Sequence, residues 1–164
     1  MIVVSNTSPL INLAHLGQLH LLQQLYGKVV IPQAVYDEIV IAGARQPGAM
    51  EVKTYDWIEV MQTTNQQMVT LLQVDVDIGE AEAIVLAIEL KPNLLLLDEH
   101  KGRQVASNLG IKFTGILGVL IEAKNHKLID AVKPIMDALI EQASFRVGST
   151  LYQRVLQIAN EQTF

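Results

Sequence analysis

Cysteine is absent from this chain of 164 residues, which excludes disulfides, thiolate metal sites and cysteine nucleophiles. Aromatic residues make up only 5% of it, so the composition does not indicate a base-stacking surface. No apolar run reaches the roughly 18 residues of a membrane span, and the N-terminus lacks the basic start of a signal peptide. We therefore expect a soluble, cytoplasmic protein that does not bind a membrane.

Several common catalytic motifs are also missing. The sequence has no GxxxxGK[ST], no GxGxxG after a strand and no GxSxG, which removes the commonest nucleotide-binding and hydrolase interpretations. The four histidines form no HxxxH or HxH pair, so a zinc site is not expected. The net charge of −5 shows no global basic footprint, but acidic residues gathered at a metal site would also lower the net charge. Composition therefore leaves nucleic acid undecided.

Half of the residues are hydrophobic, and the length suits one domain covering residues 1–164 with a substantial core. Strands are expected at residues 1–4, 28–31, 57–61, 94–97 and 112–114. Helices are expected at residues 10–16, 19–25, 32–41, 66–72, 115–124, 135–142 and 150–160. The segment 77–110 should hold two more, one that Asp77 caps and one that follows the loop beginning at Asp98 and Glu99. This alternation predicts an α/β fold with a central parallel sheet and right-handed crossovers. The C-terminal helices, at about 130–164, form either an appended element or a partner-contact element.

The segment 77–110 gives the strongest indication of a functional site. The apolar run Leu94 to Leu97 leads directly into Asp98 and Glu99, a pattern typical of a buried parallel strand. Ligands of open α/β sheets bind at the carboxyl ends of the strands. Because the first strand ends at Asn6, we expect Asn6 and Asp98 at the same edge of the sheet.

The acidic residues of the helical segments have two kinds of interpretation. Asp77 and Glu80 have the spacing of a capping box, and we assign them mainly to helix initiation. Glu80 and Glu82 point about 200° apart on a helix, so they cannot serve one site through one face. Glu82 borders an apolar face, where a carboxylate is costly without a partner or a cation, and Glu38 is placed similarly beside Val35. The alternative for Glu38 is an ordinary border residue, and Asp98 or Glu99 could simply cap the helix that follows them.

Oxygen ligands on one rim of the sheet suit Mg²⁺ or Mn²⁺. Such ions activate water and stabilise an in-line phosphodiester displacement. The candidate metal ligands are Asn6, Glu38, Glu82 and Asp98. The candidate substrate-binding residues are Thr7, Ser8, Lys101 and Arg103. The two basic side chains among them suit phosphate, although ordinary exposed helix residues would look the same.

Three ordered motifs resemble those of the PIN-domain family, in particular its small prokaryotic group related to VapC-type toxins. The motifs are NTSPLI at Asn6 to Ile11, GEAEAI at Gly79 to Ile84, and LLLDEHKGR at Leu95 to Arg103. The similarity continues through Gly110 to Lys124. The resemblance implies a three-layer α/β/α sandwich, a metal-dependent ribonuclease site of acidic residues acting on RNA, a protein antitoxin as partner, and a homodimer.

By position, the acidic residues of this family fall on Glu38, Glu82 and Asp98, which are therefore the catalytic candidates. Asn6 stands where the resemblance implies the first aspartate. An asparagine oxygen adds no negative charge, and its NH₂ group is a donor with no use toward a cation. We therefore predict a weak metal site and nuclease activity that is reduced or absent.

Two other functions are compatible with a strand-terminal aspartate. One is a non-catalytic PIN-fold module that binds RNA or protein, which Asn6 favours. The other is a phospho-acceptor receiver, but a receiver needs an acidic pair after the first strand and a lysine at a late strand end. The sequence offers neither, so the ribonuclease stays the leading hypothesis.

Overall fold

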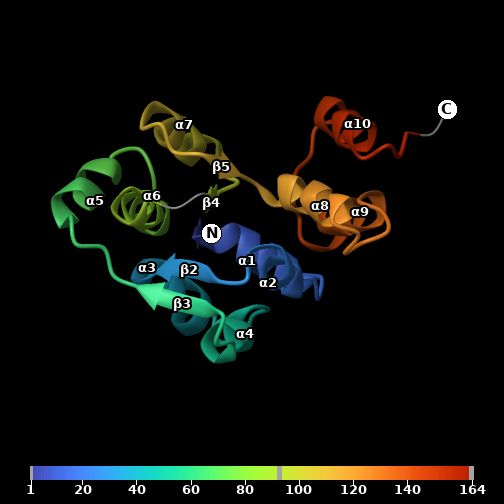
Figure 1. The fold of residues 1–164 in the computed structure, drawn as a ribbon. Helices are drawn as coiled ribbons and strands as arrows, with labels where there is room; N and C mark the ends of the chain where they lie inside the picture. The colour runs from blue at the N-terminus through green and yellow to red at the C-terminus, as the bar shows by residue number, and fades with distance from the viewer. Residues whose placement is uncertain (1, 92–93, 163–164) are drawn as a thin grey trace.

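The computed structural model describes residues 2–91 and 94–162 and is organised around a parallel β-sheet (Figure 1). The described strands are β1 (Val3–Ser5), β2 (Val29–Pro32), β3 (Ile58–Met61), β4 (Leu94–Leu96) and β5 (Phe113–Thr114). They pair in the order β3-β2-β1-β4-β5, and every described pairing is parallel. The predicted α/β fold with a central parallel sheet is confirmed. Met1, which begins the expected first strand, lies outside the described residues.

Helices cover both faces of this sheet and complete the predicted three layers. One face is covered by α1 (Thr7–His15), α2 (His20–Tyr26) and α8 (Ile116–Asn125), with α9 (Lys133–Gln142) and α10 (Ser149–Ile158) beside α8. The other is covered by α6 (Ile78–Leu90) and α7 (His100–Asn108), with α5 (Gln66–Leu72) packed on α6. Between β2 and β3 lie α3 (Gln33–Tyr36), the π-helix η1 (Asp37–Ala42) and α4 (Ala49–Thr54).

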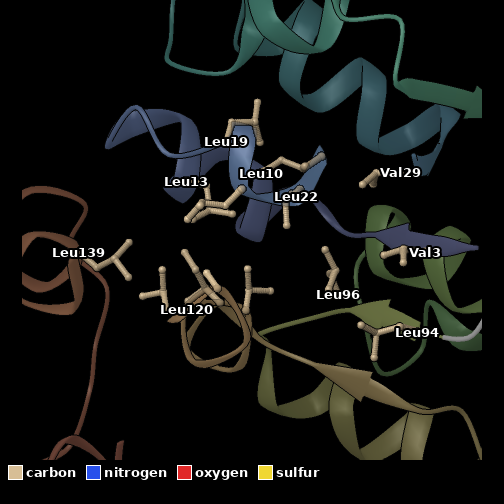
Figure 2. Packing of buried hydrophobic residues seen from close by; sticks show 14 of the residues in the cluster. Val3, Leu10, Leu13, Leu19, Leu22, Val29, Leu94, Leu96, Leu120 and Leu139 are labelled. Atoms are coloured by element: carbon tan, nitrogen blue, oxygen red, sulfur yellow. The ribbon is translucent and has the colours of Figure 1, made fainter. Parts of the chain in front are cut away.

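The apolar run at β4 is explained by burial on both faces of the sheet. Successive strand residues point to opposite sides, and Leu96 packs with Val3 against α1, α2 and α8 (Figure 2). Leu95 packs with Val4 against α6 and α7. All four side chains are fully buried, and burying a side chain such as leucine contributes about 1.5–3 kcal/mol. The two faces together therefore fix β4 beside β1.

The segment after β2 differs from the single helix expected at residues 32–41. A short α-helix, α3, passes into η1, whose turns are one residue wider. The wide turn is closed by the N–H of Gly43, which donates to the carbonyl oxygen of Glu38 at 3.1 Å. A Cβ at Gly43 would lie 2.9 Å from the carbonyl oxygen of Ile39, so the absence of a side chain permits this closure. The helix α4 was not expected.

The sheet order places the ends of β1 and β4 at a topological switch point. The chain runs outward from β1 to β2 and β3, then returns to the other side of β1 as β4. Ser5 lies opposite Leu96, and the N–H of Asn6 donates to the carbonyl oxygen of Leu96 at 3.0 Å. The predicted common edge is confirmed, and a switch point of this kind leaves a crevice beyond the strand ends.

The last two helices are joined to α8 by specific polar contacts. Glu161 accepts hydrogen bonds from the N–H groups of Val132 (2.8 Å) and Lys133 (2.9 Å) at the start of α9. It also pairs with Lys124 of α8 at 3.0 Å, and Lys124 donates to the carbonyl oxygen of Ala159. The hydroxyl of Tyr152 in α10 donates to Asp137 of α9 at 2.6 Å. These contacts fix α9 and α10 against α8.

Among residues 2–91 and 94–162, no helix combines the length and the apolar character that crossing a bilayer requires.

Candidate functional site

An acidic cavity of about 270 Å³ lies at the switch point. Its walls come from the start of α1, from η1, from the start of α6 and from the loop after β4. The residues that line it are Asn6, Thr7, Ser8, Ile11, Asn12, Glu38, Asp77, Glu80 and Glu99. We call this cavity the acidic pocket. It gathers four carboxylates from three parts of the sequence that are far apart along the chain.

Gly79 marks the point where side chains of the acidic pocket converge. A Cβ built on Gly79 would lie 3.1 Å from Oε2 of Glu38, 3.5 Å from Oδ1 of Asp77 and 3.7 Å from Oδ1 of Asn6. Any two of these oxygens are therefore no farther apart than twice 3.7 Å. Since glycine has no side chain, the space between the oxygens stays open.

Asn6 and Glu38 face the acidic pocket in different ways. Asn6 is only 4% exposed and is the N-cap residue of α1, but its side chain makes no capping hydrogen bond. Within the described residues, that side chain has no hydrogen-bond partner, although it opens onto the pocket. Glu38 accepts a hydrogen bond from the hydroxyl of Thr7 at 2.9 Å. Thr7 therefore orients the Glu38 carboxylate, while the amide of Asn6 is left available.

Asp77, Glu80 and Glu99 form the other acidic side of the pocket. Asp77 caps α6 by accepting from the N–H of Glu80 at 2.8 Å, as its sequence position predicted. Glu80 is buried, and burial is the main cause that raises its pKa to about 7; the charges of Asp77 and Glu99 act in the same direction. These carboxylates repel one another, and a bound cation would relieve that repulsion.

None of the four pocket carboxylates forms an ion pair with a lysine or arginine in the described part of the chain. Such a concentration of uncompensated acidic groups costs free energy. The stability of the fold must offset that cost, and cation binding would reduce it.

Glu82 and Asp98 do not line this acidic pocket. Oε1 of Glu82 accepts from the N–H of Ala34 at 3.1 Å, which places the carboxylate at the start of α3. Asp98 accepts from the N–H of Ile116 at 3.1 Å and lies 3.5 Å from Nη2 of Arg103. Burial raises the pKa of Asp98, while the Ile116 N–H and the Arg103 guanidinium oppose that shift.

The structure therefore brings together only part of the predicted metal-ligand set. Asn6 and Glu38 both line the acidic pocket, whereas Glu82 and Asp98 do not line it and accept from backbone N–H groups. Glu80 and Glu82 do point in different directions, as helix geometry requires, but Glu80 is the one that faces the pocket. Which of the two residues faces the pocket depends on which side of α6 packs on the sheet.

The predicted substrate-binding residues have distinct surroundings. Thr7 is engaged with Glu38, and Ser8 lines the acidic pocket while it accepts from Asn12 at 3.3 Å. Lys101 lines an adjoining cavity of about 360 Å³, together with Asp77, Glu80 and Glu99. Arg103 donates from Nε to the carbonyl oxygen of Leu97 at 2.8 Å and lies over the ring of Phe113 at 5.4 Å.

The donor set of the acidic pocket fits a hard divalent cation. All its candidate ligands are oxygens, which Mg²⁺ and Mn²⁺ prefer, and the unpartnered amide of Asn6 is one of them. In the described residues, no three histidine, aspartate or glutamate side chains stand close enough to hold a metal ion. The carboxylates would therefore have to converge by side-chain rotation. The chemistry of the donors fits, and the metal geometry is not preformed.

The family of the chain is consistent with a site at this position. A family model described as a PIN domain matches residues 2–161. The chain therefore belongs to the PIN-domain family, and the predicted membership of that family is confirmed. PIN domains generally have nuclease-type functions and use divalent metal ions. No curated protein matches the chain.

Proposed function

We propose that this PIN domain is a metal-dependent ribonuclease and the toxin-like component of a toxin–antitoxin pair. The observation that carries the proposal is the acidic pocket at the switch point, where Glu38, Asp77, Glu80 and Glu99 lie without a basic partner among the described residues. This position is where ligands of open α/β sheets bind. The family of the chain supports nuclease-type chemistry at such a site.

In this proposal Asn6, Glu38, Asp77 and Glu80 hold Mg²⁺ or Mn²⁺, with Glu99 at the rim of the pocket. A bound divalent ion would supply Lewis-acid stabilisation of phosphodiester oxygens and a lowered pKa for water. Thr7 holds the Glu38 carboxylate toward the pocket. The raised pKa of Glu80 means that metal binding would displace a proton at neutral pH, because the ligand must be ionised.

Glu82 and Asp98 act as positioning residues in this proposal. Glu82 accepts from Ala34 at the start of α3 and so fixes the element that leads into η1 and Glu38. Asp98 fixes the start of α8 and the Arg103 guanidinium. Losing the hydrogen bonds that either side chain accepts is expected to disturb the site indirectly.

Asn6 makes the proposed site weaker than one built with an aspartate at the same position. The amide oxygen carries only a partial charge, and one fewer negative ligand lowers the attraction for a divalent cation. We therefore expect weak metal binding and slow cleavage. The second candidate function, a non-catalytic module that binds RNA or protein, is favoured by this same residue.

Paired isosteric variants test the proposal. Glu80→Gln and Glu82→Gln each remove one charge from α6 and keep the shape of the side chain. We expect Glu80→Gln to weaken Mn²⁺ binding and to abolish Mn²⁺-dependent cleavage of single-stranded RNA. Glu82→Gln should keep both, because a glutamine oxygen can still accept from the Ala34 N–H. The reverse pattern would refute the proposed ligand set and favour the set predicted from the sequence.

The same assay separates the two candidate functions. An enzyme cleaves RNA in Mn²⁺, loses cleavage in Glu80→Gln and gains it in Asn6→Asp. If native protein and Asn6→Asp both bind RNA and neither cleaves it, the non-catalytic module is the correct function.

We also propose a protein antitoxin and a second copy of the chain as partners, on the basis of the resemblance to toxin-related PIN domains. Co-expression with the protein encoded by an adjacent gene, followed by co-purification, tests the first. Sedimentation analysis of the isolated chain tests the second, and a monomer at all accessible concentrations would contradict it.

A further inference from the structure

Another cavity, of about 390 Å³, lies between α8 and α10 beside β5. Three arginines line it, and its apolar wall includes two phenylalanines and aliphatic residues of α8 and α10. We call it the arginine pocket and define it by Arg103, Phe113, Leu117, Phe145, Arg146 and Arg154. Its volume falls in the range of small-molecule sites. Nothing in the proposed metal site uses it.

The arginine pocket and the acidic pocket lie next to each other at the carboxyl edge of the sheet. Asp98 lines the arginine pocket and Glu99 lines the acidic pocket. Because these residues are consecutive, their Cα atoms are about 3.8 Å apart. The two pockets therefore share the loop after β4 as part of their walls.

The basic groups of the arginine pocket are of two kinds. Arg103 is held by the carbonyl oxygen of Leu97, by Asp98 and by the face of Phe113. Arg146 and Arg154 are exposed and form no ion pair with any described residue. The pocket thus offers one fixed guanidinium and two that are free to bind an anion.

The distribution of charge along the sequence also favours an anionic ligand here. Residues 1–99 contain four lysines or arginines against twelve acidic residues, whereas residues 100–164 contain eight against five. The net charge of −5 therefore consists of −8 in the first part and +3 in the second. Residues 100–164, which include the arginine pocket, therefore suit a phosphate ligand, although the net charge of the whole chain is negative.

The walls of the pocket are held in place by the contacts of the C-terminal helices. Glu161 joins the start of α9 to Lys124 of α8, and Tyr152 joins α10 to Asp137 of α9. Val155 of α10, which also lines the pocket, is buried in the core. The apolar wall is therefore a fixed surface of the fold.

We propose that the arginine pocket holds one unstacked nucleotide of a single-stranded RNA next to the acidic pocket. The base packs against the wall formed by Phe113, Leu117 and Phe145, and the flanking phosphates contact Arg146 and Arg154. Unstacked bases bind apolar and aromatic walls in this manner, and guanidinium groups match phosphate oxygens bidentately. This inference rests on the proposed function in one respect, the identity of the substrate as RNA.

RNA binding without cleavage tests the inference separately from the proposed chemistry. The probe is a short fluorescein-labelled single-stranded RNA, and its anisotropy is followed in a chelator over a range of salt concentrations. The variants are Arg146→Ala, Arg154→Ala and the control Arg45→Ala. Arg45 is also exposed and forms no described ion pair, but it does not line the pocket.

Each pocket variant is expected to lower RNA affinity about fivefold to tenfold and to reduce the salt slope by about one. Arg45→Ala should leave both unchanged. RNA carrying 4-thiouridine is expected to crosslink to residues 113–121 and 145–158 on irradiation. Circular dichroism checks that the variants, all at exposed positions, keep the native fold.

Several results would overturn the inference. These are an absence of RNA binding, equal affinities for native protein and both pocket variants, and an equal loss in Arg45→Ala. An acidic peptide that binds in an Arg154-dependent way, while RNA does not, would assign the pocket to a protein partner. Mn²⁺-dependent cleavage with unchanged affinity in the pocket variants would refute the inference and leave the proposed ribonuclease intact. Pocket-dependent binding without cleavage would refute only the ribonuclease.

Discussion

Adding one methyl group at Gly79 should leave the fold at least as stable as before and weaken metal binding in the same variant. The Cβ of Gly79→Ala would enter the space between Glu38, Asp77 and Asn6, at 3.1, 3.5 and 3.7 Å from their oxygens. At 3.1 Å, the Glu38 oxygen must move by a few tenths of an ångström. Glu38 is an exposed side chain, so the fold tolerates that movement.

The magnitude of the stability effect comes from the backbone. Gly79 lies in the first turn of α6 without a positive φ, and alanine is better than glycine in a helix by up to about 1 kcal/mol. We therefore expect a stabilisation between zero and about 1 kcal/mol, or up to roughly 2–4 °C in Tm for a chain of this size. The methyl group also separates the oxygens, and Mn²⁺ affinity should fall at least about tenfold, which corresponds to about 1.4 kcal/mol.

Thermal unfolding and isothermal titration with Mn²⁺ measure the two effects. Gly148→Ala is the control, because a Cβ there meets nothing within 4 Å and Gly148 does not line the acidic pocket. A folded Gly79→Ala variant that binds Mn²⁺ as tightly as native protein would refute the reasoning, since no cation could then lie among these oxygens.

Three further predictions concern single positions. Asn6→Asp should raise Mn²⁺ affinity about tenfold or more by adding a charged ligand, measured by titration; unchanged affinity and cleavage would exclude Asn6 as the weak ligand. Glu161→Gln should destabilise the fold by about 1–3 kcal/mol at pH 7, because charge-assisted hydrogen bonds are lost. The native pKa of Glu161 is lowered, with hydrogen bonds to backbone N–H groups and Lys124 outweighing the opposing effect of burial. This stabilisation is complete above the unfolded pKa of about 4.3 and is lost as pH falls through the lower native pKa. The free energies of unfolding of native protein and Glu161→Gln should therefore converge in acid, and a difference that stays constant with pH would contradict this. Gly115→Ala should destabilise by about 1–3 kcal/mol, because its Cβ would overlap the Asp98 carboxylate and break a hydrogen bond to a charged group; native-like chemical denaturation would be the contrary result.

The sequence was sufficient to predict the layers and the sheet edge. The apolar run Leu94 to Leu97 indicated a strand buried on both faces, and the positions of Asn6 and Asp98 after strands predicted a common edge. These features depend on local patterns of burial. The π-helix was not predictable, because its wide turn depends on the closure between Gly43 and Glu38.

The acidic cluster was predicted only in part, for a physical reason that lies in α6. Ala81, Ala83, Ile84, Val85, Leu86 and Ala87 are all buried, so apolar residues cover most of the circumference of that helix. With little contrast in polarity between its sides, the sequence led to the choice of Glu82, whereas Glu80 is the residue that lines the acidic pocket. Helix geometry correctly separated the two, and the packing of α6 against the sheet and α3 made the selection.

Asp98 and Glu99 are a second pair of neighbouring carboxylates of which only one lines the acidic pocket. Both follow β4, and the sequence could assign either to the site. Asp98 accepts a hydrogen bond from the N–H of Ile116, which is far along the chain, and pairs with the flexible side chain of Arg103. These contacts hold Asp98 at the start of α8. Contacts of that kind depend on tertiary structure and leave no local pattern.

The π-helix η1 has a consequence for how this site can change between related sequences. A π turn is an α turn that has accommodated one additional residue. Loss of a single residue between Glu38 and Gly43 would restore ordinary α-helical spacing and rotate the preceding side chains relative to the fixed end at Gly43. Glu38 could then leave the acidic pocket with every pocket-lining residue still present in the sequence. Length variation in this segment, as well as substitution, can therefore switch the proposed metal site on or off.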